Sequence, residues 1–423
     1  MTIDGETATA PETVRPSSPR SFRLGPLYAT VPLANLVVYA VWTVVPGFLL
    51  PVTVQHLTGS TDVTSLGIAS TLGTIAATLG NPVFGQLSDR TRSRFGRRTP
   101  WMVACALAGA IMLLLQSAAS SITMLGITYA GTSLIINGFQ AAMTAVVPDR
   151  FPSAKLNVAS ALMGVGLNAG VLTGSLLFTF FPGFAGPSGY YLMAGLIAVT
   201  AFVFAVASPD ADSRDLPREP FRLGQFLRNF WISPRKHPDF AWVFLARVLL
   251  MLGYFMLFSF FFFALQDWVG LSPEQAVTAG GTLFAVNGAA SVVGGLVTVP
   301  LAHRYGRLKI FVTASGIGLA LSLLIPLLMP SYSGMVIYAL VGGLAFGVYM
   351  AVDTALINKV LPHAEDAAKD LGIMNMASAF PQVLAASLGA VLVNTVGYGG
   401  LFAASALIAA AGALAVLPVR KIR

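Results

Sequence analysis

Twelve apolar segments, each long enough to cross a lipid bilayer, follow one another along the chain. A transmembrane helix needs about 20 mostly apolar residues, because each residue advances the helix by about 1.5 Å. The expected spans are 26–50, 64–87, 101–119, 122–147, 156–181 and 190–208, then 240–265, 275–300, 309–329, 333–358, 371–394 and 399–417. The sequence therefore predicts an all-α membrane protein with twelve transmembrane helices.

The composition of the 423-residue chain requires lipid as its main solvent. Hydrophobic residues make up 56% and charged residues only 10% of the chain, and the mean hydropathy is +0.76. Soluble proteins contain roughly a quarter charged residues. The composition excludes a soluble enzyme and a disordered scaffold. The sequence also lacks a phosphate loop, zinc spacing and a nucleophile elbow, so we expect neither an enzyme nor an ATP-driven pump, and no cofactor or metal.

The basic residues predict the orientation of the chain. Twenty-four of the 25 Lys and Arg residues fall in the termini or in loops on one predicted side of the membrane. The loops on the other side carry Asp62, Asp267 and Glu274 and no basic residue. By the positive-inside rule, both termini are expected in the cytoplasm. The net charge of +8 therefore reports topology rather than a nucleic-acid partner, and we expect a monomeric, multi-pass protein of the cell membrane.

A polar segment divides the spans into two sets of six. Residues 209–239 form a predicted cytoplasmic linker with six basic and five acidic residues between two bundles at 24–208 and 240–417. Residues 1–23 and 418–423 are expected to be cytoplasmic tails, the first of them disordered. Similar loops recur at 87–98 and 301–309, so the two halves look like repeats in the same orientation. Parallel halves of this kind are a transporter architecture with the solute path between them.

The loop after the second span carries a family resemblance. Residues 85–101 read GQLSDRTRSRFGRRTPW, which resembles the loop 2–3 motif of the major facilitator superfamily. In this extended form it resembles the sugar:cation symporter branch, which includes melibiose-type carriers and sucrose transporters. The resemblance implies two pseudo-symmetric six-helix bundles and secondary active transport by alternating access.

The same motif suggests a latch between conformations. In the family, the carboxylate at Asp89 faces the start of span eleven, here at Asp370, and a carboxylate is favoured at a helix N-terminus. Arginine side chains bind carboxylates and helix-end carbonyls with forked donors across the interface between halves. The candidate latch residues are Gly85, Asp89, Arg90, Gly96, Arg97 and Arg98. Gly85 is expected to allow close helix contact. The alternative is that this cluster only determines topology.

The second span departs from the melibiose-type pattern. Those carriers have acidic cation-site residues on span two, whereas the corresponding stretch here, Ala77–Pro82, has no carboxylate. The charged sugar-binding residues of their amino-terminal half also have no counterparts in this chain. A sodium site of that kind is therefore not expected.

Two ionisable residues lie well inside predicted spans, Arg247 in the seventh and Asp353 in the tenth. Each is nine residues from a proline at the cytoplasmic end of its span, so both lie about 13 Å deep. Charges in lipid are costly and are expected to be paired and functional. In the superfamily, spans one, four, seven and ten line the central cavity, so the resemblance places both residues on one wall. We expect them to touch, either as a proton-coupling pair or as a permanent brace.

Polar side chains at helical spacing mark the other candidate cavity positions. They are Asn35, Tyr39 and Trp42 on span one, Asn137, Gln140 and Thr144 on span four, Tyr254 on span seven, Tyr349 on span ten and Gln382 on span eleven. Amide and aromatic groups suit a neutral, hydroxyl-bearing or aromatic solute. Each of these residues is also compatible with helix packing alone.

The sequence thus predicts a secondary active transporter driven by the proton gradient, with a small solute, protons and the lipid bilayer as partners. Proton-coupled symport of a sugar-like or neutral solute is the first hypothesis. A proton-driven drug or metabolite exporter is the alternative, since spans one to six contain no charged residue. A transport-inactive sensor and a channel are disfavoured, because no signalling domain and no filter-like loop is present.

Overall fold

In the computed structural model, the described residues are 24–215, 237–305, 308–360 and 367–419, and their regular structure is helical throughout. The helices are α1 Leu24–Val44, α2 Leu50–Thr58, α3 Val63–Arg90, α4 Thr99–Ser117, α5 Ile122–Arg150, α6 Leu156–Phe180, α7 Pro187–Ala207, α9 Pro238–Asp267, α10 Pro273–Tyr305, α11 Leu308–Leu328, α12 Tyr332–Val360 and α13 Ala367–Leu414. A π-helix, η1 Val45–Leu49, joins α1 to α2, and short 3₁₀ helices, η2 Ser153–Lys155 and η3 Pro182–Phe184, flank α6. Among the described residues, eleven helical segments are long and apolar enough to cross a membrane.

The last of these segments lies within α13, which is 48 residues long and is interrupted at Gly397. Gly397 adopts φ 73°, ψ −176°, so the chain changes direction there between two helical stretches. Only glycine adopts such a conformation readily, because a Cβ atom would clash with the backbone. The predicted spans at 371–394 and 399–417 lie on either side of this break.

The first span is longer than predicted. The expected helix 26–50 continues through η1 and α2 to Thr58. Pro46 and Pro51 lie in this stretch, and a proline interrupts helical hydrogen bonding because it lacks an N–H and clashes with the preceding turn. The wider turn of a π-helix absorbs the irregularity, and π-helical turns of this kind are frequent at functional sites.

Most of the predicted tails and linker fall outside the described residues, namely 1–23, 216–236 and 420–423. The linker was expected to end at residue 239, but α9 already begins at Pro238. Proline is favoured in the first turn of a helix because the N–H it lacks would have no partner there.

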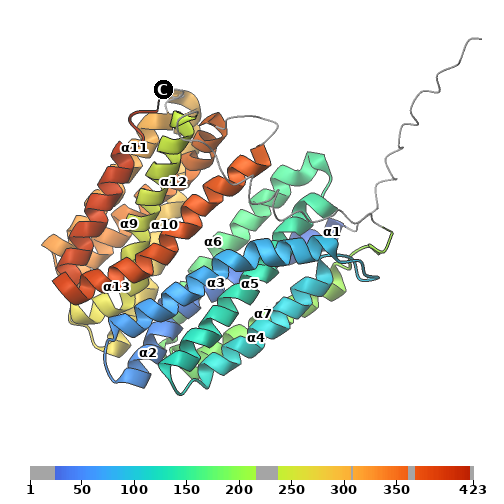
Figure 1. Ribbon diagram of the computed structural model, residues 1–423, viewed down its shortest axis with the longest axis horizontal. Coiled ribbons are helices and arrows are strands. Elements are labelled where there is room, and N and C mark those ends of the chain that lie inside the picture. Colours follow the sequence, from blue (N-terminus) through green and yellow to red (C-terminus); the bar gives the residue numbers. More distant parts are fainter. Residues whose placement is uncertain (1–23, 216–236, 306–307, 361–366, 420–423) are drawn as a thin grey trace, which may run out of the picture.

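The helices pack as two bundles that meet along two seams. Helices α1–α7, the amino-terminal half, pack mainly with one another, and helices α9–α13, the carboxyl-terminal half, do the same. Across the boundary α3 lies against α13 and α6 lies against α10. Figure 1 shows α3 in blue alongside α13 in red, between the two bundles. These two seams are the main contacts between the halves.

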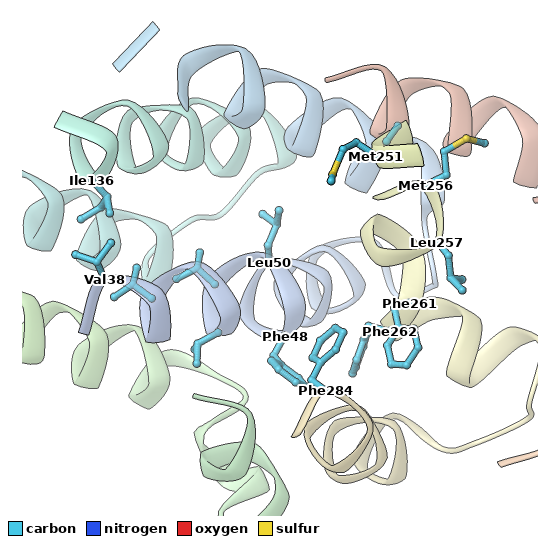
Figure 2. Packing of buried hydrophobic residues seen from close by; sticks show 14 of the residues in the cluster. Val38, Phe48, Leu50, Ile136, Met251, Met256, Leu257, Phe261, Phe262 and Phe284 are labelled. Carbon is cyan, nitrogen blue, oxygen red and sulfur yellow. The ribbon is translucent and has the colours of Figure 1, made fainter. Parts of the chain in front are cut away.

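The contacts between the halves gather at one end of the seams. In the described part of the chain, the hydrogen bonds between halves join residues 55–71 to residues 266, 267, 387 and 394. We call this the closed end. The opposite end, where α3 finishes at Arg90 and the arginine-rich loop begins, is the basic end. Figure 2 shows the apolar packing near the closed end, where Phe48 approaches Phe284, Phe261 and Phe262.

Glycines on α6 bring that helix close to α1. A Cβ atom at Gly166 would lie 2.3 Å from the carbonyl oxygen of Pro32, and one at Gly170 would lie 2.2 Å from that of Leu36. Small residues four positions apart allow this approach of two backbones in a membrane. The contact holds α6 within the amino-terminal half while its other face meets α10.

We predict that Gly170→Ala lowers the thermal unfolding midpoint of the detergent-purified protein, because a methyl group would overpack the contact with α1 at a cost of about 1–3 kcal/mol. The matched control is Gly164→Ala on the same helix, where an added Cβ meets no atom within 4 Å. The control midpoint should stay unchanged or rise, since alanine favours a helix over glycine. Equal midpoints for the two variants would contradict the tight α1–α6 contact.

Candidate functional site

The two intramembrane charges form an ion pair within the carboxyl-terminal half. Nη1 of Arg247 on α9 lies 2.5 Å from Oδ2 of Asp353 on α12. The side chains are 11% and 3% exposed, respectively. The contact expected from their matched depth is therefore present. Because the pair is shielded from water, removing either partner would leave an isolated charge in a poorly polarisable environment.

Tyr349 completes the surroundings of the pair. It lies one helical turn before Asp353 on α12 and is fully buried. Its hydroxyl is buried and has no hydrogen-bond partner among the described residues. A phenolic O–H beside a carboxylate can follow a change in its charge by turning its proton toward or away from it. The arrangement thus offers a carboxylate, a fixed cation and a phenol at one place.

A second polar group lies two turns along α9. Tyr254 donates a hydrogen bond from its hydroxyl to Oδ1 of Asn287 at 3.2 Å, and its ring stacks on Phe346 at 4.4 Å. Nδ2 of Asn287 in turn donates to the carbonyl oxygen of Ala339 at 3.2 Å. Sequence reasoning missed Asn287 because α10 was not expected to line the cavity. The sequence signal that could have found it is an isolated amide in a span whose other side chains are mostly small or apolar.

In the amino-terminal half, the structure brings Asn35 on α1 and Gln140 on α5 together. Nε2 of Gln140 donates to Oδ1 of Asn35 at 3.3 Å, and both residues are buried, at 5% and 1% exposure. Nδ2 of Asn35 and Oε1 of Gln140 have no hydrogen-bond partner among the described residues. A buried, unused donor and acceptor are costly. The pair therefore provides hydrogen-bonding capacity inside the bundle and is not exposed to an open cavity in this conformation.

The other predicted cavity residues make mainly local contacts. The Tyr39 ring meets the Trp42 ring edge to face at 5.0 Å. Asn137 and Thr144 donate to carbonyl oxygens of their own helix, at 2.8 and 2.9 Å. Gln382 lies half-buried on α13. Trp42 lines a small hollow between α1 and α5. These contacts suit helix packing as well as a solute site.

The arginines of the loop 2–3 motif bind within their own half. Arg97 forms a forked pair with Asp149, from Nη2 to Oδ1 at 2.5 Å and from Nε to Oδ2 at 3.1 Å. Nε of Arg98 lies 2.7 Å from Oδ2 of Asp149, and its Nη2 lies 2.6 Å from Oδ1 of Asp89. The expectation that Arg97 and Arg98 reach across the interface is wrong for these contacts in this conformation. Among the described residues, the printed ion pairs of Arg97 and Arg98 all lie within the amino-terminal half.

The other latch residues follow the same pattern. Asp89, 57% exposed, pairs with Arg98, whereas the side chain of its expected partner region at Asp370 lies outside the described residues. A Cβ atom at Gly85 would meet only the Cβ of Ala141 at 4.0 Å, so the close helix contact expected at Gly85 is not made here. Arg90 ends α3. Gly96 has φ +80°, and a Cβ there would overlap Asp210 at 2.1 Å.

Asp210 belongs to a buried pair that sequence reasoning missed. Nη2 of Arg150 lies 3.2 Å from Oδ2 of Asp210, with the two side chains 1% and 9% exposed. Arg150 also donates to the carbonyl oxygen of Ser208 at 2.7 Å and to Oγ1 of Thr99 at 2.9 Å. The pair ties the ends of α5 and α7 to the start of α4. The sequence signal that could have found it is the Asp149-Arg150 dipeptide directly after the fourth predicted span.

Comparison with known proteins identifies relatives for this arrangement. A family model described as Major Facilitator Superfamily matches residues 33–339 and 275–423. No curated protein sequence gives a significant match.

Solved structures share the fold at low sequence identity. The crystal structure of the nucleoside transporter NupG matches with a TM-score of 0.75 and 15% identity, covering 94% of this chain and 100% of that chain. A mutant of the same transporter matches with a TM-score of 0.77, also at 15% identity, covering 93% and 99%. A bacterial homolog of the human lysosomal transporter Spinster, in an inward-facing and unoccupied conformation, matches with a TM-score of 0.63 and 14% identity, covering 93% and 96%.

We predict that Asp210→Asn destabilises the protein by about 3 kcal/mol, because Arg150 would keep a buried charge without its carboxylate. The thermal midpoint in detergent measures this effect. Asp212→Asn is the matched control, since Asp212 pairs with Arg214 at an exposed position. The control midpoint should not move. A midpoint for Asp210→Asn equal to that of the control would show that the buried pair does not stabilise the fold.

A double-mutant cycle on the intramembrane pair should be strongly non-additive. Arg247→Gln alone should destabilise by about 3–5 kcal/mol, because it leaves the Asp353 carboxylate buried and unpaired. Adding Asp353→Asn should recover most of that loss, since two neutral amides can hydrogen-bond to each other. The readout is again the thermal midpoint. Additive losses would mean that the two residues do not act as a pair.

Proposed function

The chain belongs to the major facilitator superfamily, and on that basis we propose that this transporter moves a small neutral organic solute together with protons. The proposal depends on one observation above all, the ion pair between Arg247 and Asp353 inside the carboxyl-terminal half. The carboxylate of an ion pair that is shielded from water can gain or lose a proton when a water-filled path to it opens. A solute-dependent change of that kind is what coupling to a proton gradient requires.

We propose that the chain crosses the membrane twelve times with both termini in the cytoplasm. Counting the stretches on either side of Gly397 as two spans gives six in each half, from α1 to α7 and from α9 to α13. The positive-inside rule supports the orientation, since the loop from Arg90 to Arg98 and the linker carry basic residues. With this orientation the basic end faces the cytoplasm, and the closure at the other end makes the structure inward-facing.

The proposed coupling step is protonation of Asp353. While Asp353 is ionised, Arg247 holds it and the two helices α9 and α12 are tied together. A proton on the carboxylate removes the attraction and frees the guanidinium for a solute hydroxyl or carbonyl. Release of the proton on the cytoplasmic side would restore the pair. Asp353 would thus carry the proton, and Arg247 would bind the carboxylate again when the proton is lost.

The proposed solute is neutral and rich in hydrogen-bonding groups. In the part of the chain that the structure describes, the predicted cavity positions supply amide and phenol groups, among them the contacting pair Asn35–Gln140 and Tyr254, which donates to Asn287. Such groups recognise hydroxyl and amide functions next to apolar rings. Sugars fit this chemistry, in keeping with the loop 2–3 motif. Nucleosides also fit it, and a transporter of nucleosides is among the structural neighbours.

Export of an apolar drug or metabolite is the second candidate. It is favoured by the absence of charged residues inside the first six predicted spans, where a sugar carrier of the melibiose type has several. Exchange of protons for an apolar solute would use the same Asp353 chemistry with opposite solute direction. The test below therefore includes both solute classes.

We predict that solute addition moves protons in proteoliposomes and that Asp353→Asn abolishes the movement, because an amide cannot carry the proton. Purified protein would be reconstituted with a pH-sensitive dye inside, and sugars, nucleosides and cationic drugs would be added in turn. The matched control is Glu274→Gln, which neutralises an exposed carboxylate at the closed end and should leave the signal intact.

The solute that produces the signal separates the candidates. Acidification of the lumen on addition of an external sugar or nucleoside supports symport, whereas a signal with drugs alone supports export. If Asp353→Asn and Glu274→Gln move protons equally well, the ion pair is a brace and the proposed coupling is wrong.

A further inference from the structure

We propose that the closed end is held by a two-layer gate. Its outer layer is an amide clasp between Gln55 and Gln266, and its inner layer is an aromatic plug centred on Phe48. This inference rests on the proposed inward-facing orientation only in identifying the closed end as the outer side of the membrane. It does not depend on the solute or on proton coupling. The gate would set how often the transporter opens to the outside.

The amide clasp joins the two halves directly. Nε2 of Gln55 on α2 donates to Oε1 of Gln266 on α9 at 2.8 Å, and Nε2 of Gln266 donates back to Oε1 of Gln55 at 3.2 Å. Two primary amides paired in this way satisfy one donor and one acceptor on each side. The pairing holds whichever way the amide groups are assigned, since exchanging oxygen and nitrogen on both residues preserves it.

Asp267 adds a second link beside the clasp. Its Oδ1 accepts a hydrogen bond from Thr61 at 2.8 Å, and Thr61 belongs to the amino-terminal half. Its Oδ2 accepts one from the hydroxyl of Tyr398 at 2.9 Å. Tyr398 directly follows the break at Gly397, so the change of direction in α13 delivers the phenol to this carboxylate. Asp267 thus ties the α2–α3 turn to α9 and α13.

The aromatic plug lies about two helical turns before Gln55. Phe48 is fully buried and stacks on Phe178 of α6 at 4.6 Å with the ring planes 5° apart. On its other side it meets Phe284 of α10 edge to face at 5.4 Å, and Phe284 stacks on Phe261 of α9 at 4.9 Å. The rings cross the boundary from the amino-terminal to the carboxyl-terminal half (Figure 2).

The backbone around Phe48 is shaped for this position. Phe48 belongs to η1, so the π-helical turn sets the direction of its side chain. A Cβ atom at Gly280 would lie 3.1 Å from Cε1 of Phe48, and one at Gly47 would lie 3.0 Å from Cε2 of Phe284. The two glycines therefore leave space for rings from the opposite half. Single π-helical turns inside helices are rare and are found frequently at functional sites.

The seam between α3 and α13 is also held by contacts at the closed end, next to the gate. Nδ2 of Asn394 donates to Thr64 at 2.9 Å, and the hydroxyls of Thr71 and Ser387 lie 2.8 Å apart. A Cβ atom at Gly67, between these two contacts, would lie 2.6 Å from the Cβ of Ala390. Thr64 and Thr71 thus lie about one and three helical turns beyond Thr61. Opening the closed end must break the clasp, the plug and this seam together.

The test measures the population of the outward-open state by spin-label distances. Labels on Ser188→Cys and Ser333→Cys would report the closed end, because both serines are exposed there, one in each half. The single native cysteine, Cys105, is buried and would be replaced by alanine. Electron–electron double resonance in detergent then gives the ratio of long to short distances.

We expect the Gln55→Ala/Gln266→Ala double variant to raise the ratio of long to short distances about tenfold, because two hydrogen bonds between the halves are lost. Gln275→Ala is the matched control, since its side chain accepts a bond from the backbone of Ser272 within one half. It should leave the ratio unchanged.

Thr61→Val, which keeps the shape of a half-buried loop residue, covers the case that the double variant does not fold. Loss of the Thr61–Asp267 bond should raise the ratio about threefold. A ratio in the Gln55→Ala/Gln266→Ala variant, or in Thr61→Val, equal to that of Gln275→Ala would overturn the gate. The distances need neither a solute nor proton movement, so a failure of the proposed transport function would leave this result standing, and the reverse also holds.

Discussion

The attraction between Arg247 and Asp353 is the interaction on which the account of this transporter depends. Two opposite charges almost withdrawn from water stabilise each other only while both are present and close together. Helices α9 and α12 carry them, and these helices are positioned by α13 and by α10 and α11, respectively. The apolar packing of the carboxyl-terminal half thus determines whether the charges meet. A proton on the carboxylate removes the attraction between the two side chains that this packing holds together.

The structure closes the two halves at one end only. The described hydrogen bonds between halves lie among residues 55–71, 266–267 and 387–394, and the plug around Phe48 lies beside them. At the basic end, Arg97 and Arg98 bind Asp149 and Asp89 of their own half instead. The loop 2–3 motif therefore stiffens one bundle in this state. The exposed carboxylate of Asp89 remains near solvent, where it can meet α13 in a state closed at the basic end.

Much of the fold could be predicted from the sequence, because lipid imposes a strong constraint. Length and hydropathy locate the spans, and the charged pair is conspicuous since Arg247 and Asp353 stand alone in apolar helices. The contact between Arg247 and Asp353 was expected because the two residues have the same predicted depth in the membrane. The contact between Asn35 and Gln140 could not be predicted, because it depends on how α1 crosses α5. The Arg150–Asp210 pair was hidden for a similar reason, since 60 positions separate two residues placed in loops.

The most direct measurement of the central claim is isotope-edited infrared difference spectroscopy of the reconstituted protein, with aspartate labelled at its carboxyl carbon. The account predicts that acidification with a transported solute produces a protonated aspartic-acid carbonyl band that is absent from Asp353→Asn. It also predicts that the band weakens when the solute is withdrawn, as Arg247 regains the carboxylate. A spectrum that stays the same in wild type and Asp353→Asn would show that Asp353 remains ionised throughout, and the pair would then be a permanent brace.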